Sequence, residues 1–241
     1  MQIVIPMAGL GSRLNNYDKP KPLINVNGKP MIIRALESLK ISGDYFFIIR
    51  KSPHLDELYE TLKYFDPTCK IHILEELTRG AAETVLCMEQ EYNPQDKLVI
   101  ANCDQIMEWN SDLFLHSTRN PIYDGLVVTY HAQTEKNSYA RLDEYGNVTE
   151  ILEKQVVSTA SLNGIHFWKK TEDFIRSAKK MIMDGRTTNN EYYVAPTFNL
   201  LIEEGKKIGI FHIPVEQHHA VGTPEDLEKY LKHVDKRNEN K

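Results

Sequence analysis

A glycine-containing turn, Met7-Ala-Gly-Leu-Gly-Ser-Arg13, directly follows the first apolar run of the chain. Gly9 and Gly11 allow positive φ and close approach of a ligand, and successive backbone N–H groups in such a turn bind anions. Leu14 stands where a dinucleotide fingerprint needs its third glycine, and no Walker-type Gly-Lys-Ser is present. The turn is therefore predicted to hold phosphate oxygens, with a plain surface turn as the alternative.

Cations gather just after this turn. Arginine offers a planar fork to several oxygens and lysine a compact point charge, so such a cluster suits a polyphosphate. Prolines on both sides of Lys21 fix its backbone and leave less entropy to lose on binding. A solvated loop is the alternative. The cluster consists of Arg13, Lys19, Lys21 and Lys29, with Asp18 as its anion.

A carboxylate follows another apolar run, in Asn102-Cys-Asp104. In open α/β sheets, ligands bind beyond the carboxyl ends of the strands, and Mg²⁺ prefers oxygen ligands. Asp104 is therefore a candidate metal ligand, with a helix cap or turn residue as the alternative reading. Asn102 is expected to hydrogen-bond ligand oxygens or to serve the turn.

Composition limits the class of protein. The chain has 241 residues, a net charge of −5 and 41% hydrophobic residues, typical of one globular domain and unlike a general nucleic-acid binder. Three scattered cysteines exclude a disulfide scaffold. The sequence shows no signal peptide and no run of about 20 apolar residues. We expect a cytoplasmic enzyme with no membrane and no nucleic-acid partner.

The pattern of elements alternates in the first part of the chain, which indicates an α/β fold with a mainly parallel sheet. The later part adds a hairpin with its turn at 143–147 and a final helix capped by Thr223. We expect a single domain, 1–241, with a nucleotide-binding half (1–110), an acceptor-binding half (111–232) and a polar, frayed tail (233–241). Expected strands are 2–6, 46–49, 71–74, 97–101, 125–130, 161–168 and 208–213; expected helices are 30–39, 54–64, 82–91, 171–184 and 193–204.

The segment Pro6-Met-Ala-Gly-Leu-Gly-Ser-Arg13 with Lys19-Pro-Lys-Pro-Leu23 resembles the signature of nucleotidyltransferases that activate sugar phosphates and related metabolites. Similar segments follow in the family's order at 78–85, 102–104, 150–154, 190–193 and 221–227. The resemblance implies a Rossmann-like mixed sheet flanked by helices, of the nucleotide-diphospho-sugar transferase type, with an added hairpin and helical acceptor-binding part. It also implies that an acceptor phosphate attacks the α-phosphorus of a nucleoside triphosphate and expels pyrophosphate.

Roles for individual residues follow from this resemblance. Arg13 would clamp the pyrophosphate, Lys21 would contact the α-phosphate, and Asp104 would hold Mg²⁺ or Mn²⁺. Lys154 would contact the acceptor phosphate, with Arg141 as competitor, and Glu153 and Glu191 would accept hydrogen bonds or remain solvated charges. The expected nucleotide-binding residues are Met7, Ala8, Gly9, Gly11, Ser12, Arg13, Gly80, Ala81, Ala82 and Asn102.

One departure from the family pattern concerns the metal. A second aspartate is usual two residues before the glycine of the Gly-Thr segment, but this chain has Ala220 there. Glu216 is the possible substitute. His218 and His219 are either substrate or metal contacts or structural residues. Because neighbouring residues of a strand face opposite sides, the two histidines are not expected to share a metal.

The same resemblance indicates which donor nucleotide and which class of acceptor are favoured. The family's Gly-Thr-Ala segment is Gly80-Ala-Ala82 in this chain. This form is similar to the corresponding segment of cytidylyltransferases, and it favours CTP over UTP or dTTP. The short form resembles capsule and surface-polysaccharide enzymes, including cytidylyltransferases that act on phosphorylated glutamine. Alternatives are a sugar-1-phosphate uridylyl-, thymidylyl- or cytidylyltransferase, a glycosyltransferase of the same fold, and a non-catalytic nucleotide-binding homologue. A homodimer is possible.

Overall fold

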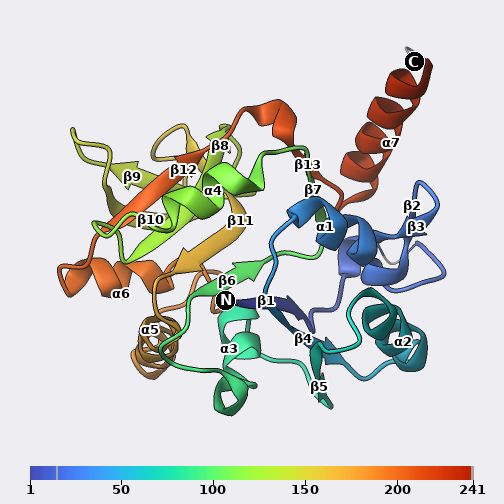
Figure 1. Cartoon of the computed structure of the whole chain (residues 1–241), viewed down its shortest axis with the longest axis horizontal. Coiled ribbons are helices and arrows are strands. Elements are labelled where there is room, and N and C mark those ends of the chain that lie inside the picture. The colour runs from blue at the N-terminus through green and yellow to red at the C-terminus, as the bar shows by residue number, and fades with distance from the viewer. Residues whose placement is uncertain (15, 240–241) are drawn as a thin grey trace.

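The computed structural model describes residues 1–14 and 16–239, so Asn240 and Lys241 at the end of the expected tail lie outside the described residues. Nine of the described strands form one mixed sheet in the order β10-β9-β11-β6-β1-β4-β5, with β8 beside β11 and β12 beside β8 (Figure 1). The strands are β1 (Gln2–Met7), β4 (Asp44–Arg50), β5 (Lys70–Leu74), β6 (Leu98–Ala101), β8 (Gly125–His131), β9 (Ser138–Leu142), β10 (Val148–Glu153), β11 (Ala160–Trp168) and β12 (Ile208–His212).

Parallel strands β6-β1-β4-β5 build the N-terminal part of this sheet, with Ile5 opposite Phe47 and Val4 opposite Ile100. Helices cover both faces, so β1 is a continuous apolar run with almost no exposed surface. The later strands β9, β10 and β11 pair antiparallel. The mixed, helix-flanked sheet expected from the sequence is confirmed.

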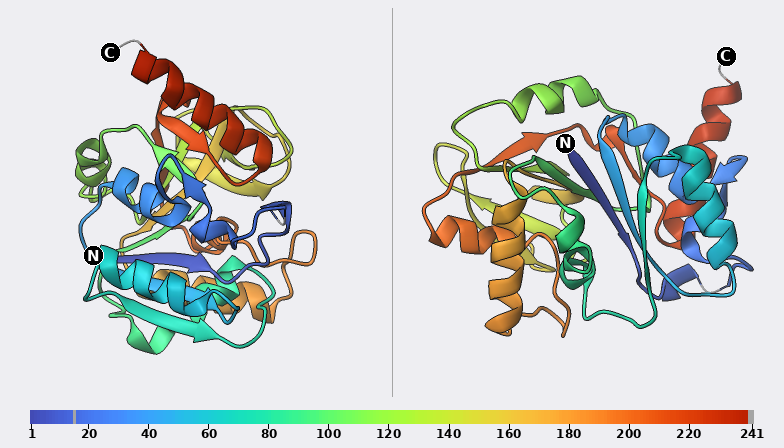
Figure 2. Two further views of the ribbon diagram at one scale, coloured as in Figure 1. Left: turned by 90° about the vertical axis from the view of Figure 1, so that its right-hand side faces the viewer. Right: turned by 60° about the horizontal axis from the view of Figure 1, so that its bottom comes forward.

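The two faces of the sheet carry separate apolar clusters, because successive side chains of a strand point to opposite faces. On one face Val4 packs in the same cluster as Val85 and Phe174, from α3 and α5. On the other, Ile5 shares a cluster with Leu36, from α1. Figures 1 and 2 show the helices on both sides. They are α1 (Met31–Leu39), α2 (Leu55–Phe65), α3 (Ala81–Leu86), α4 (Ser111–Ser117), α5 (Thr171–Met183), α6 (Thr197–Glu203) and α7 (Pro224–Glu239).

Two short strand pairs lie outside the large sheet: β2 (Asn25–Val26) with β3 (Lys29–Pro30), and β7 (Gln105–Met107) with β13 (His218–Ala220). Helix α7 begins four residues after the end of β13. The Thr223 hydroxyl oxygen accepts from the Asp226 N–H at 3.2 Å, which confirms the expected cap. The C-terminal end of α7 projects from the body in Figures 1 and 2.

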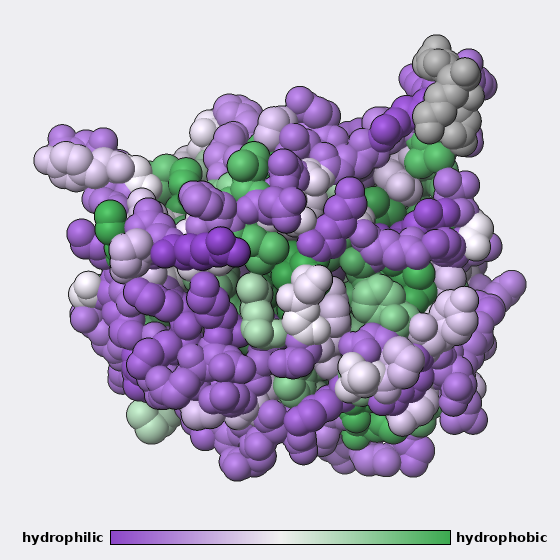
Figure 3. Space-filling model, viewed as in Figure 1, coloured by the Kyte–Doolittle hydropathy of each residue, from purple (hydrophilic) through white to green (hydrophobic). Residues whose placement is uncertain are grey.

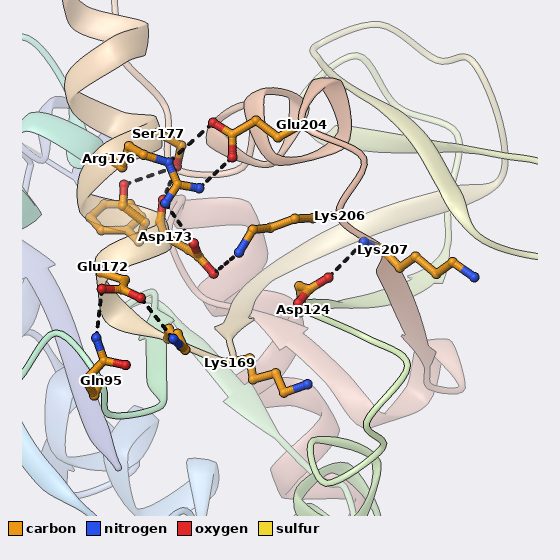
Figure 4. A network of polar contacts seen from close by, with 12 residues as sticks. Gln95, Asp124, Lys169, Glu172, Asp173, Arg176, Ser177, Glu204, Lys206 and Lys207 are labelled. Atoms are coloured by element: carbon orange, nitrogen blue, oxygen red, sulfur yellow. Dashed lines mark hydrogen bonds and ion pairs between the residues drawn. The ribbon is translucent and has the colours of Figure 1, made fainter.

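A charged network joins α5, α6 and the start of β12 (Figure 4). The Asp173 carboxylate is 2% exposed and accepts from Arg176 at 3.0 Å and from Lys206 at 2.7 Å. Arg176 also pairs with Glu204 at 2.5 Å. Each buried oxygen of Asp173 therefore faces a cation.

Several expected boundaries are wrong, for local reasons. The helix expected over 82–91 ends at Leu86, where the backbone tightens into 3₁₀-type bonds: the Cys87 N–H donates to the Thr84 carbonyl at 3.1 Å, and the Val85 carbonyl also accepts from the Tyr92 hydroxyl at 2.9 Å. The helix expected over 193–204 begins only at Thr197, after Pro196. The expected tail is not frayed up to Glu239, since α7 extends to that residue.

Hydrophilic residues cover most of the face shown in the space-filling view, with hydrophobic residues in small patches between them (Figure 3). Within residues 1–14 and 16–239, no helix has both the length and the apolar character needed to cross a bilayer.

Candidate active site

A cavity of about 440 Å³ lies where the carboxyl ends of β1 and β6 approach the hairpin β9–β10. Strand β1 lies between β6 and β4. The chain runs outward from β1 to β4 and β5 and then returns to β6 on the other side of β1. This is the switch point at which open α/β sheets bind ligands. Residues 1–110 contribute Arg13, Ala81, Asn102, Asp104 and Gln105; residues 111–232 contribute Glu153, Lys154, His166, Glu191, His218 and Asp226, among others.

Lys21 and Asp104 form an ion pair at the edge of this cavity, with Nζ 2.5 Å from Oδ2. Their side chains are only about a quarter exposed, at 22% and 25%. Burial lowers the pKa of Lys21, but the attraction of Asp104 outweighs it and holds the pKa above its usual value. Lys21 therefore stays positively charged although its side chain is largely shielded from solvent.

The backbone around Lys21 is fixed as the sequence predicts. Lys21 lies on a 3₁₀ turn, η2 (Lys21–Leu23), whose flanking Pro20 is extended and accepts the Leu23 N–H at 2.8 Å. Gly11 has a φ of +64°, and a Cβ there would lie 3.3 Å from the Cβ of Lys21. Glycine at this position allows the first loop to pack against the lysine.

The expected group of four loop cations is divided in the structure. Lys19 pairs with Glu57, and Lys29 pairs with Glu37 at 2.5 Å, both on the surface. Arg13 is exposed on the 3₁₀ turn η1 (Ser12–Leu14) and lines the cavity. Of these four cations, only Arg13 and Lys21 are placed at the site.

The glycine turn differs in detail from the prediction. Positive φ was expected at both glycines, but Gly9 does not adopt it, and a Cβ there would meet no atom of the described residues within 4 Å. The side chains of Met7 and Ala8 are buried, so these residues offer only backbone groups to a ligand. The Ser12 side chain lies outside the described part of the structure.

Gly80, Ala81 and Ala82 have separate roles. A Cβ at Gly80, whose φ is +145°, would lie 2.5 Å from backbone atoms of Tyr192. Ala82 is fully buried and its N–H donates to the Tyr192 carbonyl at 3.0 Å. Ala81 alone of the three lines the cavity. The expectation that all three face a nucleotide is therefore wrong for Ala82, and Gly80 acts in packing.

The acceptor side is built around Lys154, which has a φ of +57° at the end of β10. Its Nζ donates to the Tyr193 hydroxyl at 2.7 Å and lies 5.0 Å from the centre of that ring. Glu153 is buried, accepts from Ser138, and has its pKa raised by burial. Glu191 is exposed and lines the same cavity. These three expected substrate residues are brought together.

Two other expected residues lie elsewhere. Arg141 pairs with Glu150 at 3.3 Å and lines a different cavity, between β10 and α6, because alternate residues of a strand face opposite sides. Glu216 is exposed on the 3₁₀ turn η4 (Val215–Gln217) and is not among the cavity's described lining residues. Asp226, an acidic residue in the first turn of α7, also lines the cavity.

Sequence reasoning missed two buried polar residues of the cavity wall. Gln105 is 4% exposed, and neither its Nε2 nor its Oε1 has a hydrogen-bond partner among the described residues. His166 is 5% exposed with an unpartnered Nδ1, and burial lowers its pKa to about 3. The only signal was that Gln105 follows Asp104 directly. Unpartnered buried polar groups of this kind point to a ligand.

The adjacent histidines face opposite ways, as expected. His218 lines the cavity with its ring 4.5 Å from that of Tyr130, and burial lowers its pKa to about 4. His219 lies instead beside Glu108, with Nε2 3.6 Å from the carboxylate. A metal shared by the two histidines is therefore excluded by their placement.

Comparison with known proteins agrees with this geometry. The family model of the MobA-like NTP transferase domain matches residues 3–154, well over half of the chain. The chain belongs to this family. It is a nucleotidyltransferase, and the predicted family resemblance is confirmed.

Individual relatives show how far the likeness extends. The UTP–glucose-1-phosphate uridylyltransferase AglF of Haloferax volcanii is 24% identical, over 95% of this chain and 94% of its own. The chain spans about half the length of bifunctional relatives that it also matches. The nucleoside-diphosphate-sugar pyrophosphorylase of Vibrio cholerae RC9 superposes with a TM-score of 0.82 at 23% identity, covering 95% and 99% of the two chains. The inositol-1-phosphate CTP transferase of T. maritima gives 0.76 at 14%, covering 96% and 93%.

Proposed function

We propose that this nucleotidyltransferase moves a cytidylyl group from CTP to a small phosphorylated acceptor. The observation that carries the proposal is one cavity lined by both Lys154 and Asp104, with Lys21 held beside it by its ion pair with Asp104. A phosphate oxygen of the acceptor attacks the α-phosphorus and forms the new P–O bond. The bond to the bridging oxygen breaks, and pyrophosphate leaves with the electron pair. The attacking phosphate is already ionised, so no general base is required.

The cations have separate tasks in this reaction. Lys21 remains protonated and contacts the α-phosphate and the incoming phosphate, where charge redistributes in the transition state. Arg13, exposed at the cavity edge, clamps the leaving pyrophosphate with its planar fork. Binding of the triphosphate requires Lys21 to turn from Asp104 to phosphate oxygens.

Mg²⁺ or Mn²⁺ fits the residues present. Asp104 offers a carboxylate at the cavity edge, and Asp226 lines the same cavity, whereas Glu216 does not. Magnesium accepts one or two carboxylates and completes its shell with water and substrate phosphates. The bound ion would supply charge neutralisation at the triphosphate. Asp104, released from Lys21 by the nucleotide, would hold it.

The acceptor side fits a small anionic metabolite that carries polar neutral groups. Lys154 provides the cation for its phosphate, and Glu191 accepts from an amine or hydroxyl. Gln105 presents both an amide N–H and a carbonyl oxygen without partners among the described residues. A phosphorylated amino acid, such as phosphoglutamine in capsule synthesis, satisfies this set, as does a sugar phosphate. Ala81, the small residue at the cavity wall, leaves space for a pyrimidine, and CTP is the donor named for the T. maritima structure.

A second candidate function is supported by one observation. AglF, similar along nearly the whole chain, is named as a UTP–glucose-1-phosphate uridylyltransferase. A sugar-1-phosphate uridylyltransferase would use the same Lys21 and Arg13 chemistry with a different base contact. The family match argues against the glycosyltransferase alternative, and the joint presence of Arg13, Lys21 and Asp104 argues against a non-catalytic homologue.

The test measures pyrophosphate release with CTP, UTP, dTTP, ATP and GTP, each against phosphoglutamine, glucose-1-phosphate and inositol-1-phosphate. We expect the fastest turnover with CTP, with Lys21→Ala as the background control. Faster turnover with UTP or dTTP and glucose-1-phosphate would overturn the cytidylyl proposal in favour of the second candidate. A site built around one pyrimidine edge can reject the other strongly.

A further inference from the structure

Three side chains with metal-binding atoms converge outside the nucleotide cavity. The Nε2 atom of His233 lies 3.3 Å from Oε1 of Glu108, and the Nε2 atom of His219 lies 3.6 Å from the same oxygen. One ligand atom from each residue lies within 4.8 Å of the other two. None of the three has a part in the proposed transfer reaction.

Separate elements bring these residues together. The ladder of β7 and β13 continues past Met107, because the Glu108 N–H donates to the Gln217 carbonyl at 2.9 Å. Helix α7 packs its Leu227 and Tyr230 into an apolar cluster with Val221, just after β13. His233, one helical turn beyond Tyr230, thus lies over His219, with ring centres 4.6 Å apart.

The chemical state of the cluster suits a cation. The Nε2 atom of His219 is buried without a hydrogen-bond partner in the part of the chain described. Arg237 donates to Oε2 and leaves Oε1 facing both imidazoles. Such a second contact orients a metal-binding carboxylate.

We propose that Glu108, His219 and His233 bind a transition-metal dication of the Zn²⁺ class. Two imidazoles and one carboxylate form a donor set that Zn²⁺ accepts, and Mg²⁺, which prefers oxygen ligands, does not compete for it. Three protein ligands leave a fourth position for water. The half-exposed His233 and Glu108 give the ion a path from solvent.

The ion would fasten α7 to the β7–β13 pair and so steady the wall of the nucleotide cavity. Val221, directly after β13, donates its N–H to the Asp104 carbonyl at 2.9 Å. Gly222 is packed so closely that a Cβ there would lie 2.3 Å from Oδ2 of Asp104. The metal would therefore have a structural role, because it would hold β13, whose following residues Val221 and Gly222 contact Asp104.

The test titrates Zn²⁺ into the full chain by calorimetry in buffer saturated with Mg²⁺, without nucleotide. We expect one Zn²⁺ per chain and a rise in Tm of about 5–10 °C at a hundredfold excess over Kd. His233→Ala should lose both effects while keeping the Tm of the zinc-free parent, since its side chain is exposed by 37%. Glu108→Gln should weaken binding at least about tenfold, because the carboxylate supplies the negative charge of the donor set.

Matched variants separate this site from other zinc ligands. His116→Ala removes an exposed histidine on α4, and Cys87→Ser removes the exposed thiol; both should bind Zn²⁺ as the parent does. With Co²⁺ in place of Zn²⁺, we expect visible d–d bands without thiolate charge transfer. Absence of binding, or binding that persists in His233→Ala and is lost in Cys87→Ser, would overturn the proposal. Neither result would affect the proposed nucleotidyl transfer, which is measured with Mg²⁺ and CTP.

Discussion

Two buried polar regions of the molecule differ in whether their polar groups have partners. Around Asp173, each carboxylate oxygen meets a cation, and Arg176 is held in turn by Glu204 (Figure 4). In the candidate active-site cavity, Gln105 and His166 are as deeply buried but have polar atoms without partners among the described residues.

The difference separates a region that stabilises the fold from one prepared for a ligand. An unpaired buried polar group costs about 1–3 kcal/mol of folding free energy. A protein retains such groups where a bound molecule pairs them. The Asp173 network needs no ligand, whereas the cavity is complete only when one is bound. Substitutions in the first region should therefore destabilise the fold without changing activity, whereas those that remove unpaired groups from the second should lower activity without destabilising the fold.

The largest effect is expected from Asp104→Asn in the cavity. Loss of the carboxylate that would hold Mg²⁺ should reduce kcat on the order of 10³-fold, because metal contacts contribute several kcal/mol to phosphoryl chemistry. Pyrophosphate release at saturating Mg²⁺ measures this. Glu216→Gln, an exposed acid outside the cavity, is the control and should keep parental turnover. Parental activity in Asp104→Asn would place the metal elsewhere.

In the Asp173 network, Asp173→Ala should lower the free energy of unfolding by about 3 kcal/mol, since it leaves Lys206 and Arg176 without their buried partner. Urea unfolding measures this value, and kcat below the transition temperature should not change. Glu172→Ala, on the same helix but with an exposed side chain, should cost under about 1 kcal/mol. Equal losses in the two variants would contradict the contrast between buried and surface pairs.

Gln105→Met should stabilise the protein, in contrast to Asp173→Ala, which should destabilise it. A side chain of similar volume removes both unpaired atoms, so the unfolding free energy should rise by about 1 kcal/mol. The KM for the acceptor should increase about tenfold, because the amide contact is lost. Gln90→Met, at an exposed position, is the control and should change neither quantity. A destabilised Gln105→Met enzyme with unchanged KM would assign Gln105 to the fold alone.

The smallest effect concerns pH. His218 has its folded-state pKa lowered to about 4, mainly by burial, against an ordinary value of 6.5. Between about pH 4 and 6.5 the unfolded chain binds more protons than the folded one, so stability rises with pH and is lost as pH falls. Urea midpoints from pH 4 to 7 should follow a shallower slope in His218→Asn. The exposed-histidine control, His116→Asn, should keep the parental slope.

The N-terminal part of the fold was predictable because its signals are local. Apolar runs such as 2–6 predict buried parallel strands, and the prolines around Lys21 fix a backbone whose position follows from the strand before it. Asp104 was found from its place after an apolar run. Each of these inferences needs only the residues next to one another in the chain.

The rest depends on contacts between distant segments. Arg141 and Glu153 lie on the paired strands β9 and β10, and only the packing of that hairpin decides which one faces the cavity. Ala82 is buried because Tyr192 approaches it from far along the chain. The burial of Gln105 depends on β13, a three-residue strand too short to show a period.

The most direct test of the account measures kcat and CTP affinity for Lys21→Ala side by side. The account predicts a fall in kcat of about 10²–10³-fold with little loss of CTP binding, because the lysine acts mainly in the transition state. Lys51→Ala, which removes an exposed lysine paired with Glu75, should match the parent in both values. A Lys21→Ala enzyme with near-normal kcat would contradict the central claim that the Lys21–Asp104 site performs the transfer.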